Sequence, residues 1–137
     1  MSGYRYMLDT NICIYAIKNK PEQVQKRLLS NLKKGLCISV ITLAELEFGI
    51  EKSSRPEQAA SALMQFLSVI EVLPFTNQAA VEYGKICAYL QKKGTPIGTM
   101  DMLIAAHAKS ENAVIVTNNV KEFERVPDLK IENWAEE

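Results

Sequence analysis

Short apolar runs alternate along the chain with longer segments in which apolar residues recur every three or four positions. The short runs predict buried strands, and the longer segments predict amphipathic helices. Strands are predicted near residues 6–8, 36–40, 69–75, 113–117 and 129–131. Helices are predicted near residues 11–18, 21–32, 41–52 and 56–67, from 77 to the KKGTP segment at 92–96, and near 99–111. The alternation predicts an α/β fold with a mostly parallel central sheet flanked by helices, as a single domain spanning residues 1–137.

Residues that favour the first turn of a helix punctuate this pattern. Pro21 and Pro56 each open a predicted helix, since proline suits the first helical turn. Asn77 and Thr99 are the predicted caps of the last two long helices. The segment Thr42–Glu45 has the spacing of a capping box, in which the glutamate reaches back to the backbone N–H of the cap residue.

Charge balance and cysteine usage limit the function classes. The chain has 16 Lys+Arg and 16 Asp+Glu, so it has no overall basic field, and nucleic-acid binding would need a local patch. Cys13, Cys37 and Cys87 are widely spaced in apolar surroundings, which predicts buried thiols in a reducing compartment rather than disulfides or a zinc site. No segment has the length and purity of a membrane span, and the N-terminus lacks a secretory signal. We therefore expect a soluble, cytoplasmic protein.

Three acidic residues fall at strand ends or helix starts. Asp9 follows the first strand, Glu45 lies soon after the second, and Asp101 opens the helix after PIG at 96–98. Each has an ordinary structural explanation: Asp9 or Thr10 as a helix cap, Glu45 in a capping box, and Asp101 as a favourable charge near a helix N-terminus. In a parallel sheet, however, such positions meet at the carboxyl edge of the strands. Like charges gathered there repel one another, and a divalent cation would remove that repulsion.

Four blocks of sequence fit one known pattern. They are MLDTN at 7–11, ISVITLAELEFG at 38–49, PIG-x-x-D-x-x-IAAHA at 96–108, and VTNNVKEFERV at 116–126. Together they resemble the PIN domain, and more closely the VapC ribonuclease toxins of bacterial toxin–antitoxin pairs. Any one block is weak support, but four in order over nearly the whole chain are specific. The resemblance implies the strand order of PIN domains, a magnesium-dependent endoribonuclease, and inhibition by a cognate VapB antitoxin.

Carried over residue by residue, the resemblance assigns a candidate catalytic set. Asp9, Glu45 and Asp101 match the first three acidic positions of the family. Many PIN domains have an aspartate where this chain has Asn119, and Glu122 stands three positions later. The fourth function therefore rests on the Asn119 amide, on Glu122, or on neither. Versions with one and with two metal ions both stay open.

The chemistry of magnesium agrees with this set. Mg²⁺, for which Mn²⁺ can substitute, prefers oxygen ligands, usually one or two carboxylates with waters and substrate phosphate. Asp9 and Asp101 are the expected direct ligands, while Glu45 would bind through water or position the nucleophile. In-line attack of activated water on the phosphodiester would leave a 5′-phosphate and a 3′-hydroxyl. Thr117 is expected either to support Asp9 by hydrogen bonding or to serve as an ordinary turn residue. His107 lies six positions beyond Asp101, on roughly the opposite side of the helix, so a structural or surface role is expected.

Partners are expected from the surface pattern and from the resemblance. Basic residues near the predicted crevice are candidates for phosphate contacts: Lys18, Lys20, Lys92, Lys93, Lys121 and Arg125. The apolar segments ICIYAI (12–17), FGIEKS (48–53) and ALMQFLSVI (62–70) either pack in the core or bind a partner. The resemblance implies a structured RNA substrate such as a transfer RNA anticodon loop, a homodimer, a larger assembly with the antitoxin, and no membrane.

Two alternatives from other classes are considered. A phosphoacceptor receiver domain also gathers carboxylates around magnesium, but it needs an acidic pair after the first strand and an acceptor aspartate after the third. Here Asp9 stands alone, and LPFTN at 73–77 contains no aspartate. A catalytically inactive PIN-like binding module is supported only by the departure at Asn119. Because Asp9 and Asp101 are both present, the nuclease is favoured.

Overall fold

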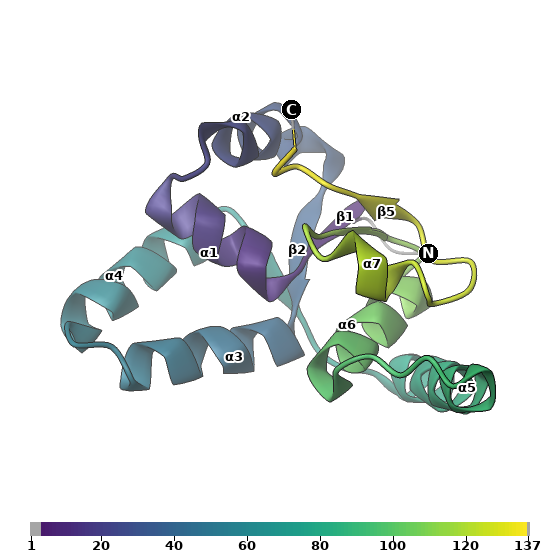
Figure 1. Cartoon of the computed structure of the whole chain (residues 1–137). Coiled ribbons are helices and arrows are strands. Elements are labelled where there is room, and N and C mark those ends of the chain that lie inside the picture. The colour runs from purple at the N-terminus through teal and green to yellow at the C-terminus, as the bar shows by residue number, and fades with distance from the viewer. Residues whose placement is uncertain (1–3, 137) are drawn as a thin grey trace.

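Five short parallel strands form the central sheet in the computed structural model, which describes residues 4–136 (Figure 1). The strands are β1 (Tyr6–Leu8), β2 (Leu36–Ser39), β3 (Glu71–Leu73), β4 (Val114–Val116) and β5 (Ile131–Glu132). Their order across the sheet is β3-β2-β1-β4-β5, and each neighbouring pair is parallel. The predicted α/β class is therefore confirmed, with a described sheet that is parallel throughout. This order also excludes a receiver domain, whose strand order is 2-1-3-4-5.

Seven α-helices connect and cover these strands within residues 4–136. They are α1 (Thr10–Lys18), α2 (Glu22–Ser30), α3 (Val40–Glu51), α4 (Pro56–Leu67), α5 (Asn77–Lys93), α6 (Thr99–Ser110) and α7 (Val120–Phe123). A short 3-10 turn, Leu32–Lys34, follows α2. The six helices expected from periodicity are present to within a few residues. The four-residue α7 was not predicted, because one turn is too short to show a helical period.

The pleat of the strands divides the core into two layers. Tyr6 and Leu8 of β1 point into a cluster with α1, α2 and α4, whereas Met7 between them points into a second cluster with α5 and α6. This alternation follows from the two-residue period of a strand. Strands buried on both faces are the rule in parallel sheets, because the crossover helices cover each side. Figure 1 shows α1 to α4 on one side of the sheet and α5 to α7 on the other.

Helix starts differ from the predicted caps by one to three positions. The α5 cap is Thr76, whose side chain accepts from Ala79 N, and Asn77 is the first helical residue. Gly98, with no side-chain cap, precedes α6, so Thr99 is not a cap. The capping box at Thr42–Glu45 was wrong as well, since α3 already begins at Val40. A cap residue needs extended backbone, and the last residue of each preceding segment supplies it.

The three cysteines differ in burial. Cys13 and Cys37 are buried, Cys87 is partly buried, and all three are free thiols. Within residues 4–136, none of the helices combines the length and apolar character needed to traverse a bilayer.

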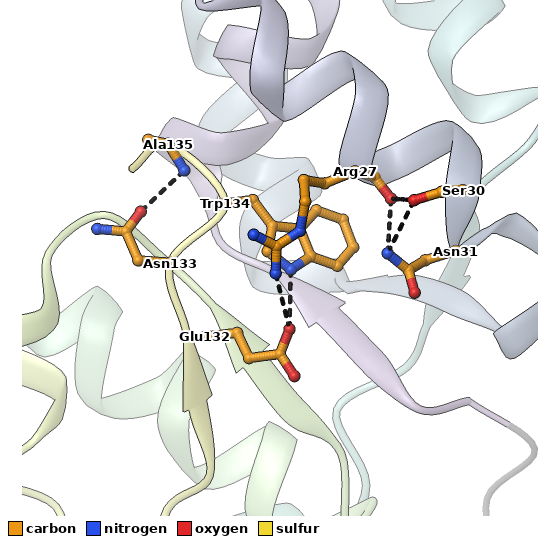
Figure 2. A network of polar contacts seen from close by, with 7 residues as sticks. All are labelled: Arg27, Ser30, Asn31, Glu132, Asn133, Trp134 and Ala135. Carbon is orange, nitrogen blue, oxygen red and sulfur yellow. Dashed lines mark hydrogen bonds and ion pairs between the residues drawn. The ribbon is translucent and has the colours of Figure 1, made fainter. Parts of the chain in front are cut away.

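The end of the chain is held against α2 by a small polar network, here called the C-terminal clamp: Arg27, Glu132 and Trp134. Glu132 Oε1 accepts from Trp134 Nε1 at 3.0 Å and lies 3.5 Å from Arg27 Nη2, as Figure 2 shows. The Trp134 ring is fully buried and packs edge-on against Tyr6 of β1, with 5.2 Å between ring centroids. The clamp therefore pairs the buried indole N–H and a guanidinium nitrogen with one carboxylate oxygen while it closes one side of the core.

Candidate active site

Asp9 lies at the junction of β1 and α1, where it is almost fully buried with 4% exposure. It caps α1, because its Oδ1 accepts from the backbone N–H of Ile12 at 2.9 Å. Its Oδ2 accepts from the hydroxyl of Thr117 at 2.5 Å. Both carboxylate oxygens are thus fixed by donors from different parts of the chain, and Thr117 makes the supporting contact that the sequence suggested.

The Asp9–Thr117 contact lies where the strand order changes direction. From β1 the chain proceeds outward to β2 and β3, and then returns to add β4 and β5 on the other side of β1. The Asp9 backbone N–H donates to Val116 O at 3.0 Å, so the ends of β1 and β4 are in direct register. In open α/β sheets, crevices that bind ligands form at this switch point, outside the carboxyl ends of the strands.

Glu45 approaches from the second turn of α3. Its Oε1 accepts from the hydroxyl of Thr10, the first residue of α1, at 2.5 Å. The carboxylate is therefore directed across to α1 rather than back to its own helix N-terminus. Thr42, its supposed capping-box partner, is instead buried, and its hydroxyl has no hydrogen-bond partner within residues 4–136.

Asp101 and Glu122 approach from α6 and α7. Asp101 lies in the first turn of α6, and its side chain hydrogen-bonds with Glu122. The Asn119 side-chain amide donates to Glu122 Oε2 through a short contact, and Asn119 N donates to Thr117 Oγ1 at 2.9 Å. Asn119 therefore contacts Glu122 directly and is linked to Asp9 through Thr117. Both candidates for the fourth position belong to this cluster.

Burial and mutual repulsion change the ionisation of two of these carboxylates. Burial, with a smaller contribution from the charge of Glu45, raises the pKa of Asp9 to about 6, against the hydrogen bonds from Thr117 and Ile12. Burial also raises the pKa of Asp101 to about 7, together with its hydrogen bond to Glu122 and the charges of Glu122, Asp9 and Glu45. Each carboxylate disfavours ionisation of its neighbours. The four acidic residues are called the acidic edge below: Asp9, Glu45, Asp101 and Glu122.

The acidic edge has no cationic partner among residues 4–136. None of the ion pairs found in residues 4–136 involves any of its four carboxylates. In the same residues, no three His, Cys, Asp or Glu side chains already converge closely enough to hold a metal ion. The donor set nevertheless suits magnesium, which takes one or two carboxylates and completes its shell with water and phosphate.

A groove borders the acidic edge between α1, α3 and α4. Its volume is about 470 Å³, and its lining is mostly apolar, with Ile17, Ile50 and Leu63 among the lining residues. Glu45 lies in its wall, and Lys18 and Lys52 are its other charged lining residues. An apolar groove that leads to a carboxylate is suited to a peptide with apolar anchors and a basic side chain.

Comparisons with known proteins decide the family. Residues 6–129 match the PIN domain family. The chain is 50% identical over 131 residues to the tRNA(fMet)-specific endonuclease VapC of Salmonella typhimurium, covering 96% of this chain and 98% of that protein. It is 48% identical over 130 residues to ribonuclease VapC2 of Rickettsia felis, covering 94% and 97% of the two chains. The chain belongs to the VapC family of PIN-domain ribonucleases.

A solved structure agrees with this membership. The fold matches the crystal structure of DNA-bound VapBC from Salmonella typhimurium with a TM-score of 0.90, at 50% identity, over 96% of this chain and 98% of that one. As a VapC protein, the chain is a ribonuclease and the toxin half of a toxin–antitoxin system. Nucleases of the PIN family generally depend on a divalent metal ion, and oxygen donors such as those of the acidic edge are the ligands that such ions prefer.

Two contacts that organise this region were not predicted. Thr10 donates to Glu45, and Ser39 caps α3 with its side-chain oxygen 3.0 Å from Ile41 N. The signal in the sequence was a small polar residue where each strand passes into a helix: Thr10 after β1 and Ser39 at the end of β2. His107 is fully buried, so of the two roles expected for it, structural or surface, the structural role is the one observed.

Proposed function

We propose that this protein is an endoribonuclease toxin, folded as a single PIN domain, that hydrolyses phosphodiester bonds of transfer RNA with Mg²⁺ held by Asp9 and Asp101. The observation that carries the proposal is the raised pKa of both carboxylates, to about 6 and about 7, in a cluster that forms no ion pair with any cation of residues 4–136. A site that keeps like charges together at a cost in stability is a typical functional site. Mn²⁺ substitutes for Mg²⁺, because both accept carboxylate and water oxygens.

Each side chain of the acidic edge has a separate task. Asp9 and Asp101 hold the divalent ion, which when bound lowers the pKa of water and stabilises negative charge on the phosphate. Glu45 orients the attacking water and accepts its proton. Thr10 holds Glu45 Oε1, while Glu45 Oε2 accepts no hydrogen bond from residues 4–136 and is available for this task. Thr117 keeps the Asp9 carboxylate in one orientation.

Glu122 fills the fourth acidic position. The Asn119 amide donates to Glu122, and Glu122 in turn is the main charged neighbour that raises the pKa of Asp101. Asn119 thus orients the Glu122 carboxylate, and Glu122, three positions later, carries the negative charge of the fourth position. A carboxylate here adds negative charge for a second ion or for ordered water, which an amide alone does not.

The substrate class follows from the named relatives. The Salmonella typhimurium and Shigella flexneri proteins are named tRNA(fMet)-specific endonucleases, at 50% and 48% identity. We extend this to the present chain, with the single-stranded anticodon loop as the cleaved segment, because splayed loops expose their bases and backbone to a protein. Phosphates flanking the cut are contacted by Lys18, Lys20, Lys92, Lys93, Lys121 and Arg125. The toxin acts in the cytoplasm, where its substrate is.

The groove beside Glu45 is the site for a VapB-type antitoxin. Apolar side chains of an antitoxin segment pack between α1, α3 and α4, acidic side chains pair with Lys18 and Lys52, and a basic side chain reaches Glu45. Solved relatives are VapBC complexes, some of them bound to DNA. A homodimer and a larger toxin–antitoxin assembly follow by analogy. Exposed Phe48 and Met64 provide additional apolar surface on α3 and α4.

The test is metal-dependent cleavage of a total transfer RNA pool by the antitoxin-free protein. The wild type should cut endonucleolytically with Mg²⁺ or Mn²⁺, and Asp9→Asn or Asp101→Asn should reduce cleavage by at least about 100-fold. Asp128→Asn is the matched control. It makes the same chemical change, from a carboxylate to an amide, at an exposed residue away from the acidic edge. An inert wild type, or variants that cut as well as the control, would overturn the proposal.

The toxin role has its own test in cells. Expression of the chain alone should arrest bacterial growth, and co-expression of its antitoxin should relieve the arrest. The Asp9→Asn variant should be harmless at the same level of soluble protein. Normal growth with abundant soluble wild-type protein would count against the role.

A further inference from the structure

His107 is a buried titratable side chain with no assigned part in cleavage. It is the only histidine of the chain, and its side chain is fully buried on α6. Its Nδ1 lies 2.7 Å from the hydroxyl oxygen of Ser39. Phe75, between β3 and α5, packs edge-on against the ring, with 5.4 Å between centroids and an interplanar angle of 74°. The imidazole is therefore fixed in position by contacts from two other segments.

The hydrogen bonds at Ser39 link the imidazole ring to the start of α3. Ser39 Oγ already accepts from the backbone N–H of Ile41 at 3.0 Å. The same oxygen has a hydroxyl proton to donate and a second lone pair to accept with, so it bonds to His107 Nδ1 in either neutral tautomer. His107 Nε2 is buried and has no hydrogen-bond partner within residues 4–136. Burial lowers the pKa of His107, against the opposing effects of Glu111 and the Pro74 backbone, so the neutral form is favoured.

The contact joins the two helices that carry the catalytic carboxylates. Ser39 ends β2 and caps α3, which carries Glu45 in its second turn. His107 belongs to α6, which carries Asp101 in its first turn. In the described part of the chain, Ser39–His107 is the only side-chain hydrogen bond found between α6 and the β2–α3 junction. It therefore gives the packing of the two helices one directional polar contact.

We propose that His107 is a positioning residue, which through its hydrogen bond with Ser39 holds the helix of Asp101 at the distance from the helix of Glu45 that cleavage requires. The inference rests on the proposed function and deepens it. Small displacements of catalytic groups lower the rate of the chemical step strongly, while contacts that bind RNA elsewhere are unchanged. The expected signature is a loss in kcat with little change in KM.

A pair of substitutions separates positioning from packing. His107→Asn keeps a hydrogen-bonding group at the δ position but loses the ring, whereas His107→Leu retains more apolar bulk but has no hydrogen-bonding group. If the hydrogen bond matters, kcat falls about 10- to 100-fold in His107→Leu and about threefold in His107→Asn, with KM within about twofold in both. If only packing matters, the Asn variant is the worse of the two. Equal or reversed kcat values would overturn the proposal.

Controls distinguish this result from general destabilisation and from failure of the proposed function. Ile86→Val trims a buried residue of the same core layer on α5 and should leave kcat within about twofold. The double variant Ser39→Ala/His107→Leu should lose no more kcat than the larger single loss, because both changes break the Ser39–His107 bond, and the α3 cap that Ser39→Ala also removes is equally missing from the Ser39→Ala single variant. If the wild type cleaves RNA and Asp9→Asn does not, the proposed function stands whatever the His107 variants do.

Nuclear magnetic resonance of the wild-type ring tests the proposal without any variant. Because His107 is the only histidine, its ring ¹⁵N signals need no assignment in tag-free protein. The expected result at pH 7 is a neutral ring, in either tautomer, with a hydrogen bond detected at Nδ1. A ring with no hydrogen bond at Nδ1 would overturn the proposed contact with Ser39.

Discussion

The acidic edge and the C-terminal clamp both contain partly buried carboxylates, but within residues 4–136 only the clamp carboxylate forms an ion pair. In the clamp, Glu132 lies between the Arg27 guanidinium and the Trp134 indole N–H, so its charge is balanced within the protein. In the acidic edge, Asp9 accepts only from a hydroxyl and a backbone N–H, while Asp101 faces further carboxylates. No cation from residues 4–136 pairs with either of these two aspartates.

This difference separates residues that stabilise the fold from residues kept for chemistry. Hydrogen bonds to Asp9 fix its orientation without neutralising it, and burial raises its pKa to about 6. Such an arrangement lowers the stability of the metal-free protein at neutral pH, and a cation from solution restores it. The clamp needs nothing from solution. The two regions should therefore respond differently to mutation, to pH and to divalent ions.

The largest expected effect concerns the clamp. Trp134→Ala removes a fully buried ring and leaves the Glu132 carboxylate without its indole donor. We expect a loss of about 3–5 kcal/mol in the free energy of unfolding, measured by urea denaturation. The cleavage rate per folded molecule should stay unchanged, because the clamp does not contact the acidic edge. A loss of activity without a loss of stability would break the distinction between the two regions.

The next effect concerns the fourth carboxylate. Glu122→Gln should reduce RNA cleavage about 10- to 100-fold, because the charge beside Asp101 is lost while the shape is kept. Glu124→Gln, two positions further on and exposed, is the matched control and should cut like the wild type. Activity is measured as initial rates on one RNA hairpin at saturating Mg²⁺. If both variants retain full activity, Glu122 does not fill the fourth position.

The smallest effect is a gain in stability. The folded-state pKa of Asp101 is raised from 3.8 to about 7, so the folded protein binds the extra proton between these pH values and its stability falls as pH rises through that window. Asp101→Asn removes this loss. Since Asp101 is only half-buried, we expect a gain of about 1 kcal/mol at pH 8 in chelator, or about 3–5 °C in Tm.

Thermal unfolding at pH 4 and pH 8 checks this sign. The variant should lose most of its advantage at pH 4, because this pH lies near the unfolded-state value of 3.8, and almost the whole pH window in which the wild type loses stability lies above it. An Asp101→Asn protein that is less stable than the wild type at pH 8 would mean that the carboxylate is already balanced within the protein.

The sequence predicted the features that depend on local pattern. Strand β1, the helices longer than two turns and the three acidic positions followed from hydrophobic periodicity and from a specific family resemblance. Side-chain direction did not follow, because it depends on which segments meet in space. Glu45 fitted a capping box in the sequence, yet its partner is Thr10 on another helix. His107 was expected to have a structural or surface role and is buried, but its contact with Ser39 depends on the packing of α6 against β2.

The central claim is that the acidic edge lacks one cation, and a Mn²⁺ titration of thermal unfolding tests it most directly. Antitoxin-free wild-type protein at pH 7.5 should gain Tm progressively with Mn²⁺, reaching about 2.7 kcal/mol of added stability at 100 times the dissociation constant. Asp9→Asn should show little gain, while Asp128→Asn should follow the wild type. A wild-type Tm that does not move with Mn²⁺, or an equal rise in the Asp9→Asn protein, would contradict the account.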